Sequence, residues 1–218
     1  MAKLVWDKSG ERFYESGVSK GVLYPKVENA YPKGVVWNGL TNVTETPEGA
    51  EATDLYADNI KYASLRSAET FGGTIEALMY PDEFAACDGN VEAETGVFIG
   101  QQERQPFGMS YVTNIGSDSK TDAGYKIHLV YGATVSPSEL SHDTINDSPD
   151  AATMSWEFDT TPESVTGHKP VSHLIIDSRK ADPTKLAELE NKLYGDDSSG
   201  EAMLPLPDEV ITMMKAVE

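Results

Sequence analysis

The sequence contains a single cysteine, Cys87, among 218 residues. A lone thiol cannot close an intrachain disulfide, so nothing points to oxidative folding. The chain also has no apolar run approaching the roughly 20 residues of a membrane-spanning helix. The segment Met1–Asp7 has no apolar core of a secretion signal, so we expect synthesis and folding in the cytoplasm.

Basic residues are scarce, and they are unevenly distributed along the chain. The chain carries 17 Lys and Arg against 36 Asp and Glu, for a formal net charge of −19. Three windows, Gly34–Ile60, Ser67–Glu103 and Ile127–His168, hold 20 acids and no Lys or Arg, so the remainder is almost neutral. A chain of this charge repels nucleic acid unless something pairs its acids, which argues against a tight nucleic-acid binder.

Helix signals are few before residue 180, and alternating strand patterns dominate. The clearest strand is 125–135, and Met154, Trp156 and Phe158 alternate in another. The remaining predicted strands are 12–18 and 21–24, joined as a hairpin at Ser19–Lys20, then 35–46, 60–69, 74–80, 97–101, 107–115 and 174–176, with breaks at 46–50 and Gly72–Gly73. These patterns predict a mainly β fold.

Two regions have helical signals. Pro81–Cys87 begins with proline, carries acids in its first turn and is followed by Gly89. Near the C-terminus, Asp182 fits an N-cap and Gly195 a C-terminal stop, and Asp208 is a candidate cap for a last helix. We expect a β domain over 1–178 and a helical segment over 179–218, which can pack on the same domain.

No catalytic histidine or cysteine emerges from the spacing. None of the histidines pairs at metal-ligand helical spacing; they are His128, His142, His168 and His173. His128 fits a sheet-surface position, and a metal clamp of His168 and His173 around Pro170 is the weaker alternative. Cys87 at a helix end is expected to be a buried, inert thiol.

Acidic and glycine-rich positions do not define a site either. Asp82 and Glu83 form a carboxylate pair, but acids are abundant enough for such pairs to arise by chance. The loop Asp118–Asp122 lacks the ligand count of a calcium loop. Gly72–Gly73 and Gly89 follow no phosphate-binding pattern. No catalytic, cofactor-binding or metal residue is therefore assigned, and a structural or binding role is favoured.

Eight strings in order resemble the major tail proteins of long-tailed, non-contractile bacteriophages that infect Gram-positive bacteria. The strings are Ser16–Pro25, Val36–Leu40, Pro47–Ala52, Tyr56–Tyr62, Tyr80–Phe84 with Cys87–Gly89, Phe107–Tyr111, Tyr125–Gly132 and Ile145–Pro149. The resemblance covers residues 16 to about 177, and the segment after residue 180 carries none of the strings.

The resemblance implies a structural virion protein without enzymatic activity or cofactor. Its fold would be a β-sandwich or barrel-like tail tube fold with one packed helix. Six subunits would form a ring by inter-subunit sheet pairing, and rings would stack into a tube that conducts genome DNA without binding it specifically. Further partners would be the tape measure, tail terminator and distal tail proteins, with assembly in the host bacterial cytoplasm and a final place in the virion tail.

Two hypotheses follow for specific segments. The acids of the three base-free windows are expected to line the lumen of the tube, where they would repel DNA; the alternative is that they keep the free subunit soluble. The polar stretch Glu45–Asn59 is expected to be a loop that contacts a neighbouring ring or subunit, and the alternative is a strand with a bulge.

Two other function classes remain open at this stage. A carbohydrate- or receptor-binding β-module would present aromatic side chains in a pocket, and Trp6, Trp37 and Trp156 are the candidates. Core packing explains Trp156 equally well, because Met154 and Phe158 share its face. A soluble hydrolase with carboxylates on loops is the third interpretation.

Overall fold

The computed structural model describes residues 3–49, 51–142, 144, 151–196 and 200–215. The protein is mainly β, as the alternating sequence patterns predict, and contains three short helices in this part of the chain. The expected string Ile145–Pro149 lies outside the described residues. None of the helices in the described part has the length and apolar composition needed to cross a membrane.

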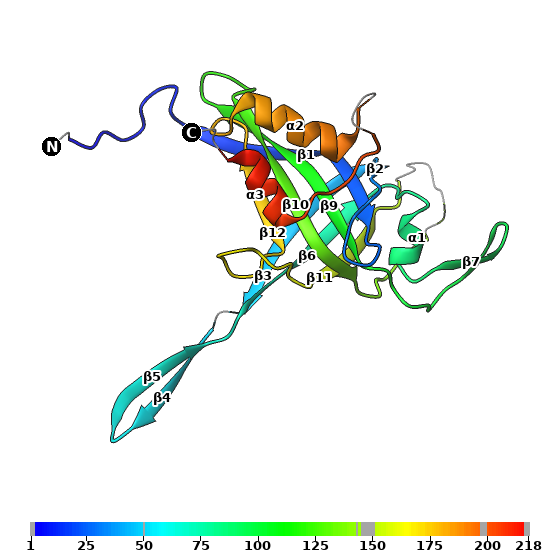
Figure 1. Cartoon of the computed structure of the whole chain (residues 1–218), viewed down its shortest axis with the longest axis horizontal. Coiled ribbons are helices and arrows are strands. Elements are labelled where there is room, and N and C mark those ends of the chain that lie inside the picture. The colour runs from blue at the N-terminus through cyan, green and yellow to red at the C-terminus, as the bar shows by residue number, and fades with distance from the viewer. Residues whose placement is uncertain (1–2, 50, 143, 145–150, 197–199, 216–218) are drawn as a thin grey trace.

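One large antiparallel sheet forms the body of the molecule (Figure 1). Its strands are β1 (Phe13–Pro25), β2 (Val35–Trp37), β3 (Leu40–Gly49), β6 (Glu69–Ala77), β9 (Phe107–Ser117), β10 (Gly124–Val135), β11 (Met154–Thr160) and β12 (His173–Asp177). The order is β2-β1-β9-β10-β11-β6-β3, and β12 adds to β10. The sheet curls so far that Gly21 of β1 meets Leu40 of β3, where an added Cβ would lie 2.2 Å from Leu40 Cδ1.

The inner face of the curled sheet encloses the first core. Side chains of β1, β2, β6, β9, β10 and β11 meet there, and the short helix α1 (Phe84–Cys87) inserts Phe84 and Cys87 among them. The predicted helix over 81–87 therefore exists, but its α-helical part begins only at Phe84. Trp37, Phe84 and Trp156 form an aromatic group, with ring centroids 4.5 to 5.9 Å apart.

The C-terminal helices cover the outer face of β1, β9, β10 and β12 and form the second core with them. They are α2 (Pro183–Tyr194) and α3 (Pro207–Met214), which lie over these strands in Figure 1. Asp182 caps α2 as predicted, since its carboxylate accepts hydrogen bonds from the amides of Thr184 and Lys185. The predicted cap of α3 is wrong, because Asp208 lies inside the helix and binds Thr166 instead.

The hairpin predicted at Ser19–Lys20 is wrong, because β1 is one continuous strand. Both of its halves pair with β9, from Phe13 opposite Ser117 to Pro25 opposite Phe107. The register shifts on both sides of Ser19 are β-bulges, which absorb the turn-like residues without reversing the chain.

The strand breaks predicted at 46–50 and Gly72–Gly73 are also wrong. β3 runs through Pro47 to Gly49, and its place at the sheet edge tolerates proline. β6 runs through both glycines, where the backbones approach closely: a Cβ on Gly73 would lie 2.2 Å from the carbonyl oxygen of Thr44. Glycine permits this contact because it has no side chain.

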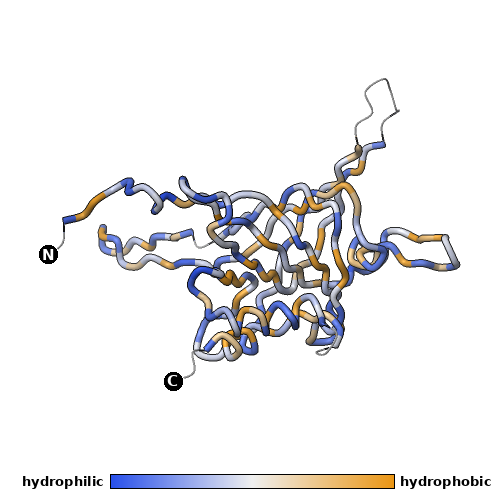
Figure 2. Tube along the Cα trace, turned by 90° about the horizontal axis from the view of Figure 1, so that it is seen from above, coloured by the Kyte–Doolittle hydropathy of each residue, from blue (hydrophilic) through white to orange (hydrophobic). Residues whose placement is uncertain are grey.

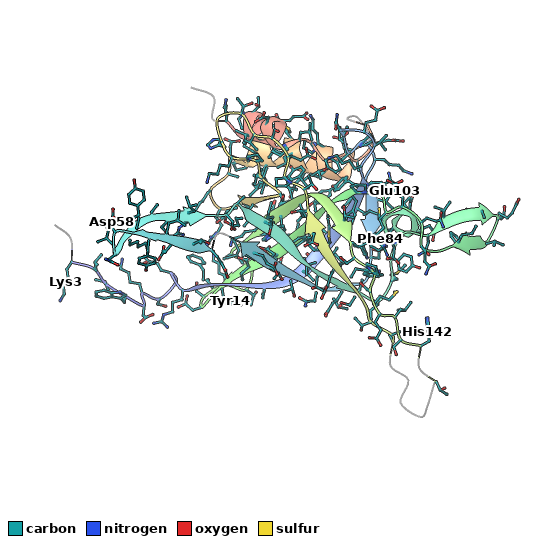
Figure 3. All side chains as sticks on the ribbon, turned by 90° about the horizontal axis from the view of Figure 1, so that it is seen from below. Lys3, Tyr14, Asp58, Phe84, Glu103 and His142 are labelled. Carbon is teal, nitrogen blue, oxygen red and sulfur yellow. The ribbon has the colours of Figure 1, made fainter. Side chains whose placement is uncertain are left out.

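Two hairpins project from opposite sides of the body (Figures 1 and 3). One pairs β4 (Ala52–Ala57) with β5 (Ile60–Arg66), and Asp58, labelled in Figure 3, lies at its tip. The other pairs β7 (Val91–Glu94) with β8 (Val97–Ile99). The loop predicted over Glu45–Asn59 is therefore wrong, because its described residues, except Glu51, belong to β3, to β4 and to the tight turn between β4 and β5.

Candidate functional site

Three titratable side chains from distant parts of the chain meet on the inner face of the sheet. They are Glu45 of β3, His128 of β10 and His173 of β12, here called the histidine cluster. Strand register places them. Glu45 lies opposite Gly73, which lies opposite Phe158, so Glu45 shares the inward-facing row of the buried Phe158. Ile75 and Trp156 form the next inward row, because side chains alternate between the two faces.

Distances within the histidine cluster are those of direct contact. His128 Nδ1 lies 3.1 Å from Glu45 Oε1 and 3.2 Å from His173 Nε2. His173 Nε2 lies 3.6 Å from the same Glu45 oxygen. The His128 side chain is 5% exposed and that of His173 12% exposed, whereas Glu45 keeps about a third of its side chain in solvent. The cluster is thus a buried pair of imidazoles with a carboxylate at its rim.

Aromatic rings hold both imidazoles in place. The ring of Tyr111 lies parallel to His128 at a centroid distance of 4.7 Å, and the ring of Phe71 stacks on His173 at 4.6 Å. Tyr111 also donates a hydrogen bond of 2.7 Å from its hydroxyl to Glu45. The imidazoles therefore have little freedom to turn away from the carboxylate.

Hydrogen bonds on the far side of His128 determine its tautomer. The Thr113 hydroxyl donates to Glu15 at 2.6 Å, so its oxygen is left to accept from His128 Nε2 at 3.0 Å. Glu15 is held in turn by an ion pair with Lys126. With its proton on Nε2, a neutral His128 directs the Nδ1 lone pair toward Glu45 and His173.

The environment shifts the ionisation of the cluster. A hydrogen bond from a His128 that also carries a proton on Nδ1, followed by that from Tyr111, lowers the pKa of Glu45 to about 2. Burial lowers the pKa of His173 to about 4, so this imidazole is neutral at pH 7. Burial, with the hydrogen bond to Glu45, raises the pKa of Tyr111. At neutral pH the cluster therefore holds one carboxylate and at least one neutral imidazole.

Tyr111→Phe is expected to lower the free energy of unfolding by about 1–2 kcal/mol at pH 7. The change removes a hydrogen bond to a carboxylate. Because this carboxylate is partly exposed, the hydrogen bond contributes less to stability than a fully buried one would. The lowered pKa of Glu45 stabilises the fold above pH 4.5, and this contribution is lost as the pH falls toward 2. Urea denaturation measures the change, with Tyr62→Phe at a 74% exposed position as the control. Equal stability of the two variants would contradict the prediction.

The sequence prediction was wrong for His128. His128 lies on a strand as expected, but it is buried instead of exposed. His173 contacts His128, and the weaker alternative, a clamp with His168, does not form, because His168 lies exposed in the preceding loop. His142 is exposed as well. His128 and His173 meet because Val130 of β10 pairs with His173 of β12. This pairing could have identified the cluster, but the spacing of the histidines along the chain does not reveal it.

The other sequence candidates stay separate from the histidine cluster. Cys87 is fully buried, and burial raises the pKa of its thiol to about 12, in agreement with an inert cysteine. Glu83 pairs with Lys33 at 3.4 Å instead of with Asp82. Asp118 accepts hydrogen bonds from the amide of Gly10, as a loop anchor does.

The tryptophans do not form an exposed aromatic pocket. Trp37 and Trp156 are 2% and 5% exposed and pack 5.9 Å apart in the inner core. Trp6 is 75% exposed, in the N-terminal segment that precedes β1. The feature expected of a carbohydrate-binding module is therefore not built from these three residues.

A second surface of interest is the outer face of β3, β6 and β11, here called the acidic face. Residues that lie opposite one another on the three strands form rows across this face. One row contains Thr46, Gly72 and Asp159, and the next contains Thr44, Thr74 and Glu157. Glu48, Glu76, Glu157 and Asp159 lie on this face, and the three strands contain no Lys or Arg. A shallow polar depression around Gly72 is lined by Glu48, Glu157 and Asp159.

Apolar side chains on the projecting hairpins form the third surface. On β4–β5 the exposed members are Leu55, Tyr56, Ile60, Tyr62 and Leu65, of which Tyr56 and Tyr62 are more than 70% exposed. On β7–β8 they are Val91, Val97, Phe98 and Ile99. Figure 2 shows apolar positions along both hairpins, outside the packed body.

No protein-family model and no curated protein matches this chain. The fold and these surfaces define a mainly β protein with a buried histidine cluster, an acidic face and two exposed apolar hairpins.

Proposed function

We propose that this chain is a structural subunit of a bacteriophage tail tube, which assembles with copies of itself into rings and stacked tubes. The β4–β5 hairpin is the observation that carries the proposal. An isolated two-stranded hairpin is marginally stable in water, and this one exposes five large apolar side chains. A permanent monomer has no use for such an element, whereas a second copy of the chain would bury it.

The sheet edge supports ring formation. Within the described part of the chain, β3 is an outer strand of ten residues that pairs with β6 alone. Long edge strands invite pairing with another chain, and a head-to-tail contact repeated around an axis closes into a ring. In this proposal β3 pairs with a neighbouring subunit in the ring, and β4–β5, which follows β3 directly, reaches the adjacent ring.

The acidic face supports a lumen. The outer face of β1, β9, β10 and β12 is covered by α2 and α3, whereas no helix in the described part of the chain covers the outer face of β3, β6 and β11, and these strands contain no basic residue. Acids on a tube wall would repel a DNA duplex and let it slide, because tight binding requires bases that neutralise phosphates. The three acids Asp143, Asp147 and Asp150 of the base-free windows lie outside the described residues.

The remaining partners follow from the role as a tube. Tape measure, tail terminator and distal tail proteins would be further partners of the assembled tube. The subunit would assemble in the host bacterial cytoplasm and remain in the virion tail, without catalytic activity or cofactor.

Negative-stain electron microscopy and light scattering on the purified protein test the proposal. We expect sixfold rings or hollow tubes that form as the protein concentration rises. A monomer at all concentrations, over a range of salt that screens the net charge of −19, would overturn it. Glycan binding by that monomer would instead favour a receptor-binding module.

A further inference from the structure

We propose that Glu45, His128 and His173 bind one divalent transition-metal ion, with Zn²⁺ as the probe. Two imidazoles and one carboxylate form a donor set common in zinc sites that leave one position open. The inference goes beyond the role as a tube subunit and does not depend on it, since the site lies within one chain.

The donor atoms have the spacing that a metal ion requires. Separations among His128 Nδ1, His173 Nε2 and Glu45 Oε1 are 3.1, 3.2 and 3.6 Å. Ligands about 2.0–2.2 Å from a tetrahedral zinc lie roughly 3.3–3.6 Å apart. Small side-chain movements are therefore sufficient for all three atoms to reach one ion.

The lone pairs also point to a cation. The Thr113 hydroxyl donates its proton to Glu15, so its oxygen accepts a hydrogen bond from His128 Nε2. The neutral form of His128 therefore has its lone pair on Nδ1, facing the cluster. That lone pair faces a carboxylate oxygen and a second imidazole nitrogen, which repel one another unless a proton or a metal ion lies between them. The chain Glu15–Thr113–His128 is the outer-shell arrangement that orients a histidine ligand.

Binding would join parts of the sheet that are not neighbours. β3 and β10 are separated by β11 and β6 in the strand order. β11 pairs with the C-terminal end of β10, whereas β12 pairs with its residues 126–130. Glu45 lies four residues before Gly49, where β3 ends and the chain continues to the β4–β5 hairpin. The ion would therefore fix the base of this hairpin to the body, and its fourth position would face solvent on the exposed side of Glu45.

Zinc titration of protein stripped with a chelator tests the site, by calorimetry and by native mass spectrometry. We expect one Zn²⁺ per chain and a higher thermal midpoint. His173→Gln and Glu45→Gln each remove a ligand and are expected to weaken binding by more than about 100-fold, beyond the 10–100-fold typical of outer-shell changes. Thr113→Val, a positioning change, is expected to fall within that outer-shell range. His142→Gln, at an exposed histidine, is the matched control and is expected to bind as the wild type does.

Two measurements on the wild type keep the test decisive if a variant fails to fold. Histidine ring resonances in NMR spectra are expected to shift for His128 and His173 on addition of zinc, and to stay unchanged for His142 and His168. Cobalt substitution is expected to produce the visible absorption of a site with nitrogen ligands. Absence of stoichiometric binding, or shifts confined to His142 and His168, would overturn the proposal and leave the cluster as a proton-bridged pair.

Discussion

Tubes are expected to disappear when Tyr56 and Tyr62 are both replaced by aspartate, while the subunit stays folded. The two side chains are 71% and 74% exposed, so the substitutions remove little intramolecular packing. Exposed positions of this kind change stability by about 0.5 kcal/mol or less. In the proposed ring-to-ring contact, tyrosines at buried positions contribute about 2 kcal/mol or more each, and the contact recurs for every subunit. Losing two of them weakens each contact by roughly 1,000-fold.

Electron microscopy of assembly reactions measures the loss, and circular dichroism confirms the fold. The double change of Tyr56 and Tyr62 to phenylalanine is the matched control, since it keeps both rings and is expected to keep the tubes. Normal tubes from the aspartate variant would show that the β4–β5 hairpin makes no essential contact.

Phe84→Ala is expected to destabilise the subunit by about 3–5 kcal/mol, the range of large-to-small changes in a core. Phe84 is fully buried, and its ring contacts Trp37, Trp156 and Phe107 at centroid distances of 4.5, 5.1 and 5.7 Å. The substitution leaves a cavity where α1 closes the inner core, because the rigid rings around it cannot collapse inward. The loss is comparable to the total stability of many domains.

Urea denaturation at concentrations that keep the subunit unassembled measures this effect. Phe98→Ala on the β7–β8 hairpin is the matched control, because Phe98 is 57% exposed and its truncation leaves no cavity. We expect its effect to stay within about 0.5 kcal/mol. A loss below 1 kcal/mol for Phe84→Ala would contradict the role of α1 in the core.

Local periodicity was sufficient to predict an element where the residues of one segment determine its secondary structure. The alternation of Met154, Trp156 and Phe158 predicts a strand, and Trp156 and Phe158 are buried on one face of β11. Asp182 as an N-cap and Gly195 as a C-terminal stop predict α2, whose Leu186, Leu189 and Leu193 pack on the sheet. These features need no knowledge of distant partners, since period and capping are properties of consecutive residues.

Turn-forming residues misled the prediction where a distant strand overrides their preference. Ser19–Lys20 and Gly72–Gly73 have the composition of turns, yet each lies inside a strand. The residues before and after each pair are hydrogen-bonded to a neighbouring strand, β9 in the first case and β3 in the second. Pairing with β9 stabilises the bulges of β1, and close approach to β3 requires glycine at position 73. Tertiary contacts of this kind outweigh local propensity.

By itself, the sequence determined the β-rich class, the C-terminal helix α2 and the uneven charge that leaves β3, β6 and β11 without a base. Only the tertiary structure decided that Glu45 turns inward while Glu157 and Asp159 face outward, and that His128 and His173 meet. The physical reason is strand register, because a shift of one residue would exchange the two faces of a strand. Residues 45 and 128 contact each other through that register, which no local pattern encodes.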